Sequence, residues 1–566
     1  MARARPRTLT AASDRGIRQR VRQRADPMST HKVTNQTRPR SDLDEYAANT
    51  ALVEGVGRYL PDAAQARLHE VGRRVGSAAF QADAARANRR EPVLHTHDRY
   101  GNRIDEVDYD ESYHRIIAAA IGDGAHTSAW AHPGPGANVE RAAVFMLYAQ
   151  VEPGHACPVS MSHAAVPVLR QAPDLADHWL PRLYSTRYDG RLVPGKTSAI
   201  FGMAMTEKQG GSDVRANTTT ATPTGDGRYL LRGHKWFCSA PMSDAFLVLA
   251  QAPGGLSCFL VPRLLADGTR NGIRLMRLKD KLGNRANASS EVEYEDAVGL
   301  LIGEEGRGVR TIIDMVDQTR LDNVFGATAG MRQATAEAAW HVRHRRAFGA
   351  TLIDQPAMTA VIADLQLETE AATAAALRLA RAHDDDADDA ERAFRRLATP
   401  VMKYWVCKRG PGHAYEALEC LGGNGYTEDF PLAMRYREQP VMAIWEGSGN
   451  VIALDVLRAM AREPQCVEAF DAELETARGT DPRLDAHLDR TRRLAREVAA
   501  DPQPATRARE LVAALALALQ GSLLVRTAPA AVADAFTASR LTDGATGHLY
   551  GALPPGVDAA AVAARA

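Results

Sequence analysis

The hydrophobic and polar positions divide the chain into a helical region, a β-rich region and a second helical region. From about residue 44 to residue 171 the apolar residues recur at spacings of three and four, as at Ala63, Ala66, Leu68 and Val71. This period is typical of amphipathic helices. Proline and glycine clusters at 133–136 and 153–154 interrupt the pattern and predict helix ends.

Between about residue 198 and residue 303 the pattern changes to short β runs separated by turn residues. Residues 291–294 alternate apolar and polar positions, as a half-buried strand does. The spacing favours a compact antiparallel barrel or sandwich. The expected strands are 229–233, 235–238, 245–250, 258–261 and 291–294.

A second helical region begins after Gly303–Gly308. Long amphipathic patterns predict helices over 309–343, 355–383, 390–420 and 449–462. The aspartate run at 384–389 lacks the glycine and glutamate spacing of a calcium loop, so a solvated connection between helices is expected. No run of eighteen apolar residues predicts a transmembrane helix, and Leu511–Leu519 is expected to be a buried helix.

Composition adds a charge asymmetry to this picture. The chain has 566 residues and a formal net charge of zero, but residues 1–27 carry eight arginines and two aspartates. This segment is expected to be a disordered leader, or to reflect a start assigned too early with Met28 as the true start; a transit peptide is conceivable on composition. The remaining chain is mildly acidic, which does not favour sequence-independent DNA binding.

The six cysteines form no CxxC pair. A metal site or a disulfide framework is therefore not expected. Reduced, buried thiols in a cytoplasmic protein are the simplest interpretation.

Two glycine-rich bends carry the candidate chemistry. Met205–Asp213 reads Met-Thr-Glu-Lys-Gln-Gly-Gly-Ser-Asp, and its glycines allow the backbone to approach a flat ligand closely. Trp445–Asn450 reads Trp-Glu-Gly-Ser-Gly-Asn and follows a second glycine cluster, Leu421–Tyr426, by about twenty residues. Taken alone, Gly-Gly-Ser-Asp would be read as an ordinary turn.

Together these motifs resemble the acyl-CoA dehydrogenase superfamily of FAD enzymes and, within it, the AidB-type DNA-alkylation-response flavoproteins. The likeness is carried by Met146–Glu152, Met205–Val214, Leu278–Arg285 and Trp445–Asn450. It covers about residues 30–460 strongly and the rest of the chain weakly.

The resemblance implies an α+β fold with an N-terminal helical domain, a central β-barrel domain and a C-terminal four-helix bundle. Most members of the superfamily end near Arg462, so an extra helical domain is expected here. The expected boundaries are 1–27 for the leader, 28–197, 198–304 and 305–462 for the three domains, and 463–566 for the extra domain.

The resemblance also implies FAD as the cofactor and a homotetramer built as a dimer of dimers. Arg345, Phe348 and Gln355 match an element that reaches the FAD of a neighbouring subunit. The full set of expected cofactor-binding residues is Met203, Met205, Thr206, Gly211, Ser212, Trp236, Phe237, Ser239, Arg345, Phe348, Gln355, Gly423, Trp445, Gly447, Ser448 and Asn450.

Glu446 occupies the usual family position of the catalytic base. The alternative position falls near Thr319, which cannot act as a base, although Glu446 could also serve only as a helix cap. Asp317 and Arg320 match an element on the CoA side of the pocket. Arg458 matches an arginine that shares the cavity in AidB-type proteins, and an ion pair with it would lower the pKa of Glu446.

The C-terminal region is implicated in DNA binding in AidB-type proteins. Arg490, Arg492, Arg493 and Arg496 form a local cluster, and three of them share one broad helix face. This face could contact phosphates, or it could be a solvated face paired with Asp485, Asp489 and Glu497.

The resulting expectation is a cytoplasmic, tetrameric FAD protein of the DNA alkylation response that binds double-stranded DNA and oxidises acyl-CoA weakly or not at all. A metabolic acyl-CoA dehydrogenase that passes electrons to an electron-transfer flavoprotein is the alternative. A flavin oxidase acting on a small molecule such as a nitroalkane is a third possibility.

Overall fold

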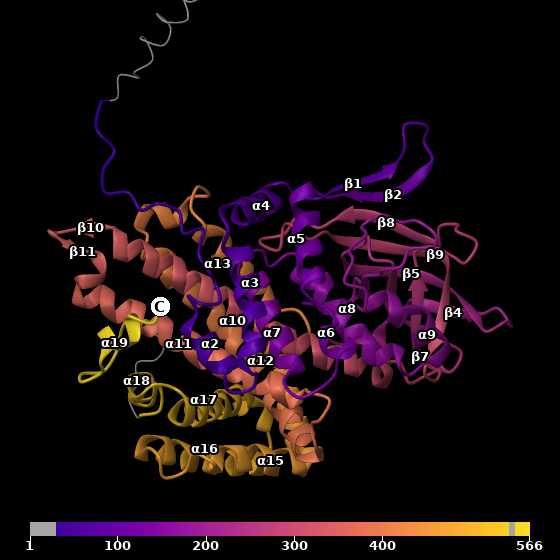
Figure 1. Ribbon diagram of the computed structural model, residues 1–566. Coiled ribbons are helices and arrows are strands. Elements are labelled where there is room, and N and C mark those ends of the chain that lie inside the picture. Colours follow the sequence, from indigo (N-terminus) through magenta and orange to yellow (C-terminus); the bar gives the residue numbers. More distant parts are fainter. Residues whose placement is uncertain (1–29, 543–548) are drawn as a thin grey trace, which may run out of the picture.

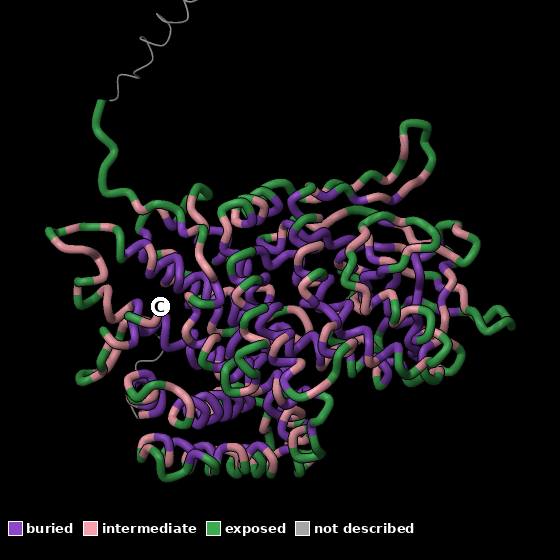
Figure 2. Tube along the Cα trace, in the orientation of Figure 1, coloured by how far each residue is buried: buried purple, intermediate pink, exposed green. Residues whose placement is uncertain are grey.

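The computed structural model describes residues 30–542 and 549–566, so the expected basic leader, residues 1–27, lies outside them. The described chain forms an N-terminal helical region, a β domain, a long-helix bundle and an extra helical layer (Figure 1). Buried residues gather in the interior of the bundle and of the β domain, whereas the turn between β1 and β2 is exposed (Figure 2). This order of regions confirms the expected fold class.

The N-terminal region is helical, as predicted, but it contains one unpredicted β-hairpin. The Asp98 side chain closes the hairpin turn by accepting hydrogen bonds from the amides of Tyr100 (2.8 Å) and Asn102 (2.9 Å). The hairpin projects from the body of the molecule (Figure 1). The elements are α2 (Thr50–Val56), α3 (Asp62–Gly76), α4 (Ala78–Arg89), β1 (Val93–His97), β2 (Arg103–Asp108), α5 (Glu111–Gly122), α6 (Ser128–Ala131), α7 (Ala137–Ala149), α8 (Ala156–Leu169) and α9 (Pro173–Leu183).

The β domain closes on itself. Its strands pair in the order β3-β6-β4-β5-β9-β7, β7 pairs again with β6, and β8 pairs with β9. The five strands β6, β4, β5, β9 and β7 therefore form a closed ring, which is the expected barrel. The elements are β3 (Phe201–Ala204), η1 (Val214–Ala216), β4 (Thr220–Pro223), β5 (Arg228–Ser239), β6 (Ala245–Ala252), β7 (Gly255–Pro262), β8 (Ile273–Leu278) and β9 (Ser289–Ile302).

The two strands expected at 229–233 and 235–238 are one bent strand, β5. Its register against β9 shifts on either side of Gly233–Lys235. Gly233 has φ +149°, and a Cβ atom there would lie 2.6 Å from the Cα atom of Thr219. The bend therefore requires glycine, and the prediction mistook this bulge for a strand end.

The four long helices predicted after the β domain are confirmed within one residue at each end. They are α10 (Gly308–His344), α11 (Pro356–Ala382), α12 (Asp389–Glu419) and α14 (Gly449–Arg462). Shorter elements lie between them: β10 (Arg346–Ala347), β11 (Ala350–Thr351), η2 (Leu352–Asp354), η3 (Gly422–Tyr426) and α13 (Leu432–Met442).

The aspartate run between α11 and α12 is not wholly solvated. Asp384 is buried, and its carboxylate accepts hydrogen bonds from the amides of Gly136 (2.8 Å) and Asn138 (2.7 Å) at the start of α7. These amides have no acceptor inside α7, so the carboxylate accepts the hydrogen bonds that the first turn of the helix would otherwise leave unmade.

The extra layer contains α15 (Pro464–Glu475), α16 (Pro482–Ala500), η4 (Pro504–Arg507), α17 (Ala508–Thr527), α18 (Ala530–Arg540) and α19 (Ala559–Ala563). The segment Pro504–Thr527 is long and apolar enough to cross a membrane, but two thirds of its apolar window is buried inside the protein. The predicted buried helix is thus the core of this layer. Arg565, which follows α19, binds Glu54 on α2 (2.7 Å) and Glu370 on α11 (2.6 Å). These ion pairs hold α19 against both helices.

A buried ion pair joins the N-terminal region to the bundle. Both terminal nitrogens of Arg141 on α7 donate to the carboxylate of Asp322 on α10 at 2.7 Å. The two side chains are only 1% and 2% exposed. Arg67 and Glu140 join α3 to α7 in a similar way, but both of these side chains are partly exposed.

We expect Arg141→Met to lower the free energy of unfolding by about 3–5 kcal/mol, because it leaves the buried Asp322 without a partner. The matched variant Arg67→Met should cost no more than about 1 kcal/mol, since its pair is solvated. Denaturant unfolding of both variants measures the difference. Equal effects would contradict a structural role for the buried pair.

Candidate functional site

The predicted flavin loop, Met203–Ser212, leaves the β domain at the end of β3. The side chains of Met203, Met205 and Thr206 are partly exposed, and residues 208–210 are fully exposed. Gly211 packs so closely that a Cβ atom would lie 2.4 Å from the Thr206 hydroxyl oxygen. Ser212 is exposed at the end of the loop.

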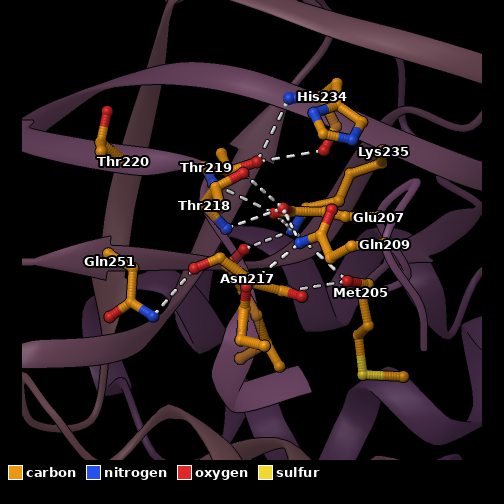
Figure 3. Close-up of polar contacts among 12 residues, drawn as sticks. Met205, Glu207, Gln209, Asn217, Thr218, Thr219, Thr220, His234, Lys235 and Gln251 are labelled. Carbon is orange, nitrogen blue, oxygen red and sulfur yellow. Dashed lines mark hydrogen bonds and ion pairs between the residues drawn. The ribbon is translucent and has the colours of Figure 1, made fainter. Parts of the chain in front are cut away.

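Glu207 anchors this loop from beneath, as Figure 3 shows. Its carboxylate accepts hydrogen bonds from Lys235 Nζ (2.8 Å), from the Gln209 side chain (2.8 Å) and from the backbone amides of Thr218 (2.7 Å) and Thr219 (3.1 Å). Both Glu207 and Lys235 are 0% exposed. The loop thus presents its outer face to a ligand while its inner face is held by a buried carboxylate.

Burial alone would raise the pKa of Glu207. Hydrogen bonds from Lys235 and the threonines outweigh this cost and hold the pKa well below its usual range. Lys235 also donates to the backbone carbonyl of Leu249 at 2.7 Å. The ion pair therefore ties the loop to both β5 and β6.

Trp236, Phe237 and Ser239 follow on β5. The Trp236 amide donates to the Thr206 carbonyl oxygen (2.9 Å), which fixes the strand against the loop. Lys279 Nζ lies 3.1 Å from the centroid of the Trp236 ring, and Phe237 is half exposed. β5 therefore brings an aromatic surface to the edge of the loop, and Lys279, which follows β8, adds a cation.

The bend at Trp445–Asn450 holds Glu446 in a strained backbone conformation, with φ +56°. Non-glycine residues rarely adopt this region, and such strain clusters at functional sites. Lys403 on α12 is buried and donates to the carbonyl oxygens of Trp445 (2.9 Å) and Gly447. Arg320 donates to the Glu446 carbonyl oxygen (3.2 Å), so two cations hold the bend.

The Glu446 carboxylate receives one hydrogen bond from a neighbouring side chain, from the Thr319 hydroxyl at 2.8 Å. Burial raises the pKa of Glu446, although Thr319, Arg320 and Lys403 oppose this shift. A carboxylate with a raised pKa is the kind of group that acts as a general base near neutral pH.

The expected ion pair between Arg458 and Glu446 does not form. Arg458 is 56% exposed at its side chain and binds Asp455 (3.1 Å) one turn earlier on α14. Asp455 in turn binds Arg320 (2.8 Å). The carboxylate that neutralises these arginines is therefore Asp455, and Glu446 keeps its raised pKa.

A cavity of about 400 Å³ opens between α8, α10 and α12, and no residue of the bend that holds Glu446 is among those that line it. Asp317 and Gln318, which immediately precede Thr319, line it on α10. Arg320 lies 3.9 Å from Asp317 and so links the cavity to Glu446. The other lining residues are Trp130, Pro167, Asp314, His383, Arg392, Arg395, Arg396, Thr399 and Pro400.

The remaining predicted flavin contacts lie on other segments of the chain. Phe348 is 96% exposed on the β10–β11 hairpin, which lies at the opposite end of the molecule from β4 and β5 (Figure 1). Arg345 and Gln355 flank the same hairpin. Gly423 lies on η3, where a Cβ atom would meet nothing within 4 Å. Ser448 and Asn450 are exposed at the start of α14.

Two of the four predicted DNA-contacting arginines are engaged within the extra layer. Arg492 binds Asp471 (2.7 Å) and also Glu475. Arg490 donates to the carbonyl oxygen of Leu541. These two side chains therefore hold the layer together.

Arg493 and Arg496 are exposed on α16, and neither forms an ion pair with any residue that the structure describes. Glu497, one of the acids expected to neutralise this face, binds Arg507 at 3.1 Å instead. The exposed part of the predicted cluster thus consists of two arginines.

Sequence reasoning missed the side chains that position the site. Glu207 lies inside the recognised motif but had no assigned role, and Lys235 and Lys403 were not singled out. The sequence offers one signal for such buried lysines, which is a lysine flanked by apolar residues in a strand or helix. This signal does not indicate which residue the lysine binds.

Comparisons with known proteins cover most of the chain. Family models match the N-terminal domain of the adaptive response protein AidB at 35–190, the acyl-CoA dehydrogenase middle domain at 202–297 and the acyl-CoA dehydrogenase C-terminal domain at 306–461. AidB of Escherichia coli (strain K12) is 45% identical over 474 residues, which span 83% of this chain and 88% of that protein.

Two solved structures share the fold. Caenorhabditis elegans ACDH-11 in complex with C11-CoA has a TM-score of 0.82 and 27% identity, covering 90% of this chain and 92% of that one. An acyl-CoA dehydrogenase of Bacillus anthracis complexed with FAD has a TM-score of 0.63 and 18% identity, and the match covers 75% of this chain and 80% of that one.

We expect Lys235→Met to lower the free energy of unfolding by about 3–5 kcal/mol and to weaken FAD retention, because Glu207 then loses its buried cation. The matched variant Lys208→Met changes an exposed lysine of the same loop and should stay within about 0.5 kcal/mol. Denaturant unfolding and flavin absorbance after gel filtration measure both effects. Full FAD retention by Lys235→Met would contradict the anchoring role.

Proposed function

The chain belongs to the AidB-type branch of the acyl-CoA dehydrogenase family, and from this premise we propose an FAD flavoprotein of the adaptive response whose Glu446 site binds an acyl-CoA thioester. The observation that supports the thioester part is Glu446, a half-buried residue whose carboxyl has a raised pKa and no ion-pair partner among the described residues.

FAD is the standard cofactor of this family, and the residues present fit it. The backbone at Gly210 is open, and Gly211 packs too tightly for a side chain, as a loop that lies against a flat ring requires. The Trp445 indole nitrogen is buried without a partner in the described chain, so it has a free hydrogen bond to donate. The Met203–Ser212 loop, Trp236 and Ser239 would hold the flavin.

When bound, FAD supplies an acceptor for the hydride that leaves the β-carbon of the thioester. The protein must then take the α-proton, and Glu446 is the carboxylate placed to do so. Thr319 orients this carboxylate through its hydroxyl group, and Arg320 and Lys403 fix the backbone on which it stands.

The cavity that Asp317 and Arg320 link to Glu446 suits the CoA part of such a ligand. Its volume of about 400 Å³ lies in the usual range of small-molecule sites. Arg392, Arg395 and Arg396 line it from the first turns of α12, and Arg395 has no ion-pair partner in the described chain. Guanidinium groups bind phosphate oxygens through paired hydrogen bonds, so these arginines favour the phosphates of CoA.

This geometry also supports the second candidate, a metabolic acyl-CoA dehydrogenase that passes electrons to an electron-transfer flavoprotein. An arginine bound to Glu446 would weaken the base, and Arg458 binds Asp455 instead. A carboxyl group that no arginine weakens in this way supports proton abstraction in either role.

Glu446→Gln should slow the reduction of bound flavin by acyl-CoA by about 10²–10⁴-fold, because it removes the base. In the unsubstituted protein the rate should rise with pH as Glu446 ionises, with a midpoint above the ordinary glutamate pKa of 4.5. Thr319→Val should move this midpoint to higher pH, since the hydroxyl group stabilises the carboxylate. Stopped-flow absorbance with a panel of acyl-CoAs measures the rates.

Thr328→Val is the matched control, because Thr328 lies on the same helix and bonds only a carbonyl within it. It should leave the pH midpoint unchanged. Unaltered flavin reduction in Glu446→Gln would overturn the assignment of the base.

A homotetramer is part of the proposal. The exposed Phe348 and its neighbours Arg345 and Gln355 lie too far along the molecule to reach the flavin loop of their own chain, which supports a flavin site shared with a second copy (Figure 1). A cytoplasmic location is proposed as well, and the six free cysteines fit a reducing compartment.

Binding of double-stranded DNA through the extra layer is the remaining part of the proposal. It is supported by the likeness to AidB and by the exposed Arg493 and Arg496 on α16, which lies at the outer edge of the layer (Figure 1). Two arginines per copy form a weak phosphate contact, and a tetramer would combine several of them.

Arg493→Gln combined with Arg496→Gln should weaken DNA binding and lower the slope of log K against log salt by about 2 for each engaged chain. Arg478→Gln is the control, because this arginine is already paired with Glu475 and Asp489. Fluorescence anisotropy of FAD-loaded protein with duplex DNA across a salt series measures both. Absence of binding even at low salt would end the DNA proposal.

A further inference from the structure

A small recess at the junction of the β1–β2 hairpin and the β domain concentrates positive charge. Its volume is about 20 Å³, which accommodates one compact ligand and excludes a nucleotide. Four arginines line it: Arg103 on β2, Arg263 and Arg270 between β7 and β8, and Arg274 on β8. None of these residues belongs to the flavin loop or to the Glu446 site.

Arg263 is the unusual member of this group, because it is only 7% exposed and lacks a close acid. One terminal nitrogen donates to the sulfur atom of Met242 at 3.4 Å, a weak acceptor. Its nearest carboxylate within the described residues is Glu106, at 3.9 Å. The same oxygen of Glu106 also accepts from Arg270, so it is shared.

A buried guanidinium without a direct anionic partner is costly. Burial lowers the pKa of Arg263, and the nearby Arg270 adds to this effect, while Glu106 opposes it. An additional anion close to Arg263 would relieve both the desolvation and the repulsion between the two arginines.

The other arginines are fixed in place and keep donors to spare. Arg103 donates to Asp105 (2.9 Å) and to the carbonyl oxygen of Leu275 (3.1 Å), and Arg274 donates to Glu295 (3.0 Å). Each guanidinium has five N–H donors, so several remain for a ligand.

Asn271, which also lines the recess, does not compete for an anion. Its amide nitrogen donates to the carbonyl oxygens of Pro262 (2.8 Å) and Val298 (2.9 Å). Its oxygen accepts from the amides of Gly272 and Val298. Asp105 also lines the recess, and its carboxylate already accepts from Arg103 and from the Leu275 amide, so the remaining donors belong to the arginines.

We propose that this recess binds a compact tetrahedral oxyanion of the phosphate class, with Arg263 as its buried partner and Arg103, Arg270 and Arg274 as its partly exposed ones. Planar guanidinium forks match the paired oxygens of phosphate. The ligand is inorganic phosphate or the phosphate group of a small phosphomonoester.

The bound anion joins two parts of the fold. Arg103 belongs to the projecting hairpin, whereas Arg263, Arg270 and Arg274 belong to the β domain. An oxyanion that contacts both sides therefore clamps the hairpin against the barrel and slows its opening.

Isothermal titration of full-length, FAD-loaded protein with inorganic phosphate, at constant ionic strength in chloride, tests the proposal. We expect one saturable site per chain, and a parallel titration with glycerol phosphate separates the free ion from the phosphomonoester. Arg274→Gln and Arg103→Gln should each weaken binding by about tenfold. A wild-type titration without saturable heat, or displacement of phosphate by an equal concentration of chloride, overturns the proposal.

Arg232→Gln is the matched control, because Arg232 pairs with Asp296, the neighbour of the acid that holds Arg274. It should bind phosphate as the wild type does, and equal weakening in this variant overturns the site. Hydrogen exchange over residues 93–108 should slow with phosphate in the wild type and not in Arg274→Gln. Unchanged exchange in both overturns the clamp.

Discussion

The buried ion pair between Glu207 and Lys235 is the constraint on which the proposed flavin site depends. A loop that receives a flat ligand must leave its outer face open, so it must be held from the inside. Glu207 accepts hydrogen bonds from four neighbouring residues, and Lys235 carries the contact on to the carbonyl oxygen of Leu249. An ion pair this deep is stable only because its remaining hydrogen-bonding capacity is satisfied.

The Trp445–Asn450 bend is also held by buried charged side chains, but here the charges are positive. In the Met203–Ser212 loop the Glu207 carboxylate accepts from backbone amides, whereas at Trp445–Asn450 the cations Lys403 and Arg320 donate to backbone carbonyl oxygens. These contacts support the positive φ of Glu446. The two cations oppose the rise in the pKa of Glu446, but burial outweighs them. The carboxyl group is thereby positioned without losing its basicity.

The sequence predicts the secondary-structure elements that depend on neighbouring residues. It fails for features that depend on contacts with residues far along the chain. The long helices were located within one residue because their period is sustained over many turns. The β1–β2 hairpin was missed because two short strands inside a helical region give too little periodicity. Gly233 was read as a strand end, since its role depends on Thr219 of the neighbouring strand.

The same limit applies to the site. Glycine motifs and Glu446 could be recognised because they are contiguous, whereas Lys235 lies 28 positions after its partner. The resemblance places Arg458 beside Glu446. In the structure Arg458 binds Asp455, an acid one turn away on the same helix. Spacing along the chain indicates which residues share a face, but it does not indicate which of two acids an arginine will bind.

Two arginines of the extra C-terminal layer attach it to the rest of the protein. Arg540 binds the buried Asp364, and Arg565 binds Glu54 and Glu370, so these arginines are not available to a polyanion. Only the outward-facing part of α16 retains unpaired positive charge among the predicted DNA contacts. Two arginines per copy offer few phosphate contacts, so repetition of this small surface by assembly would strengthen the proposed attraction for DNA. Under the proposal that a second chain supplies the Arg345–Gln355 segment to the flavin, assembly is a condition for both proposed activities.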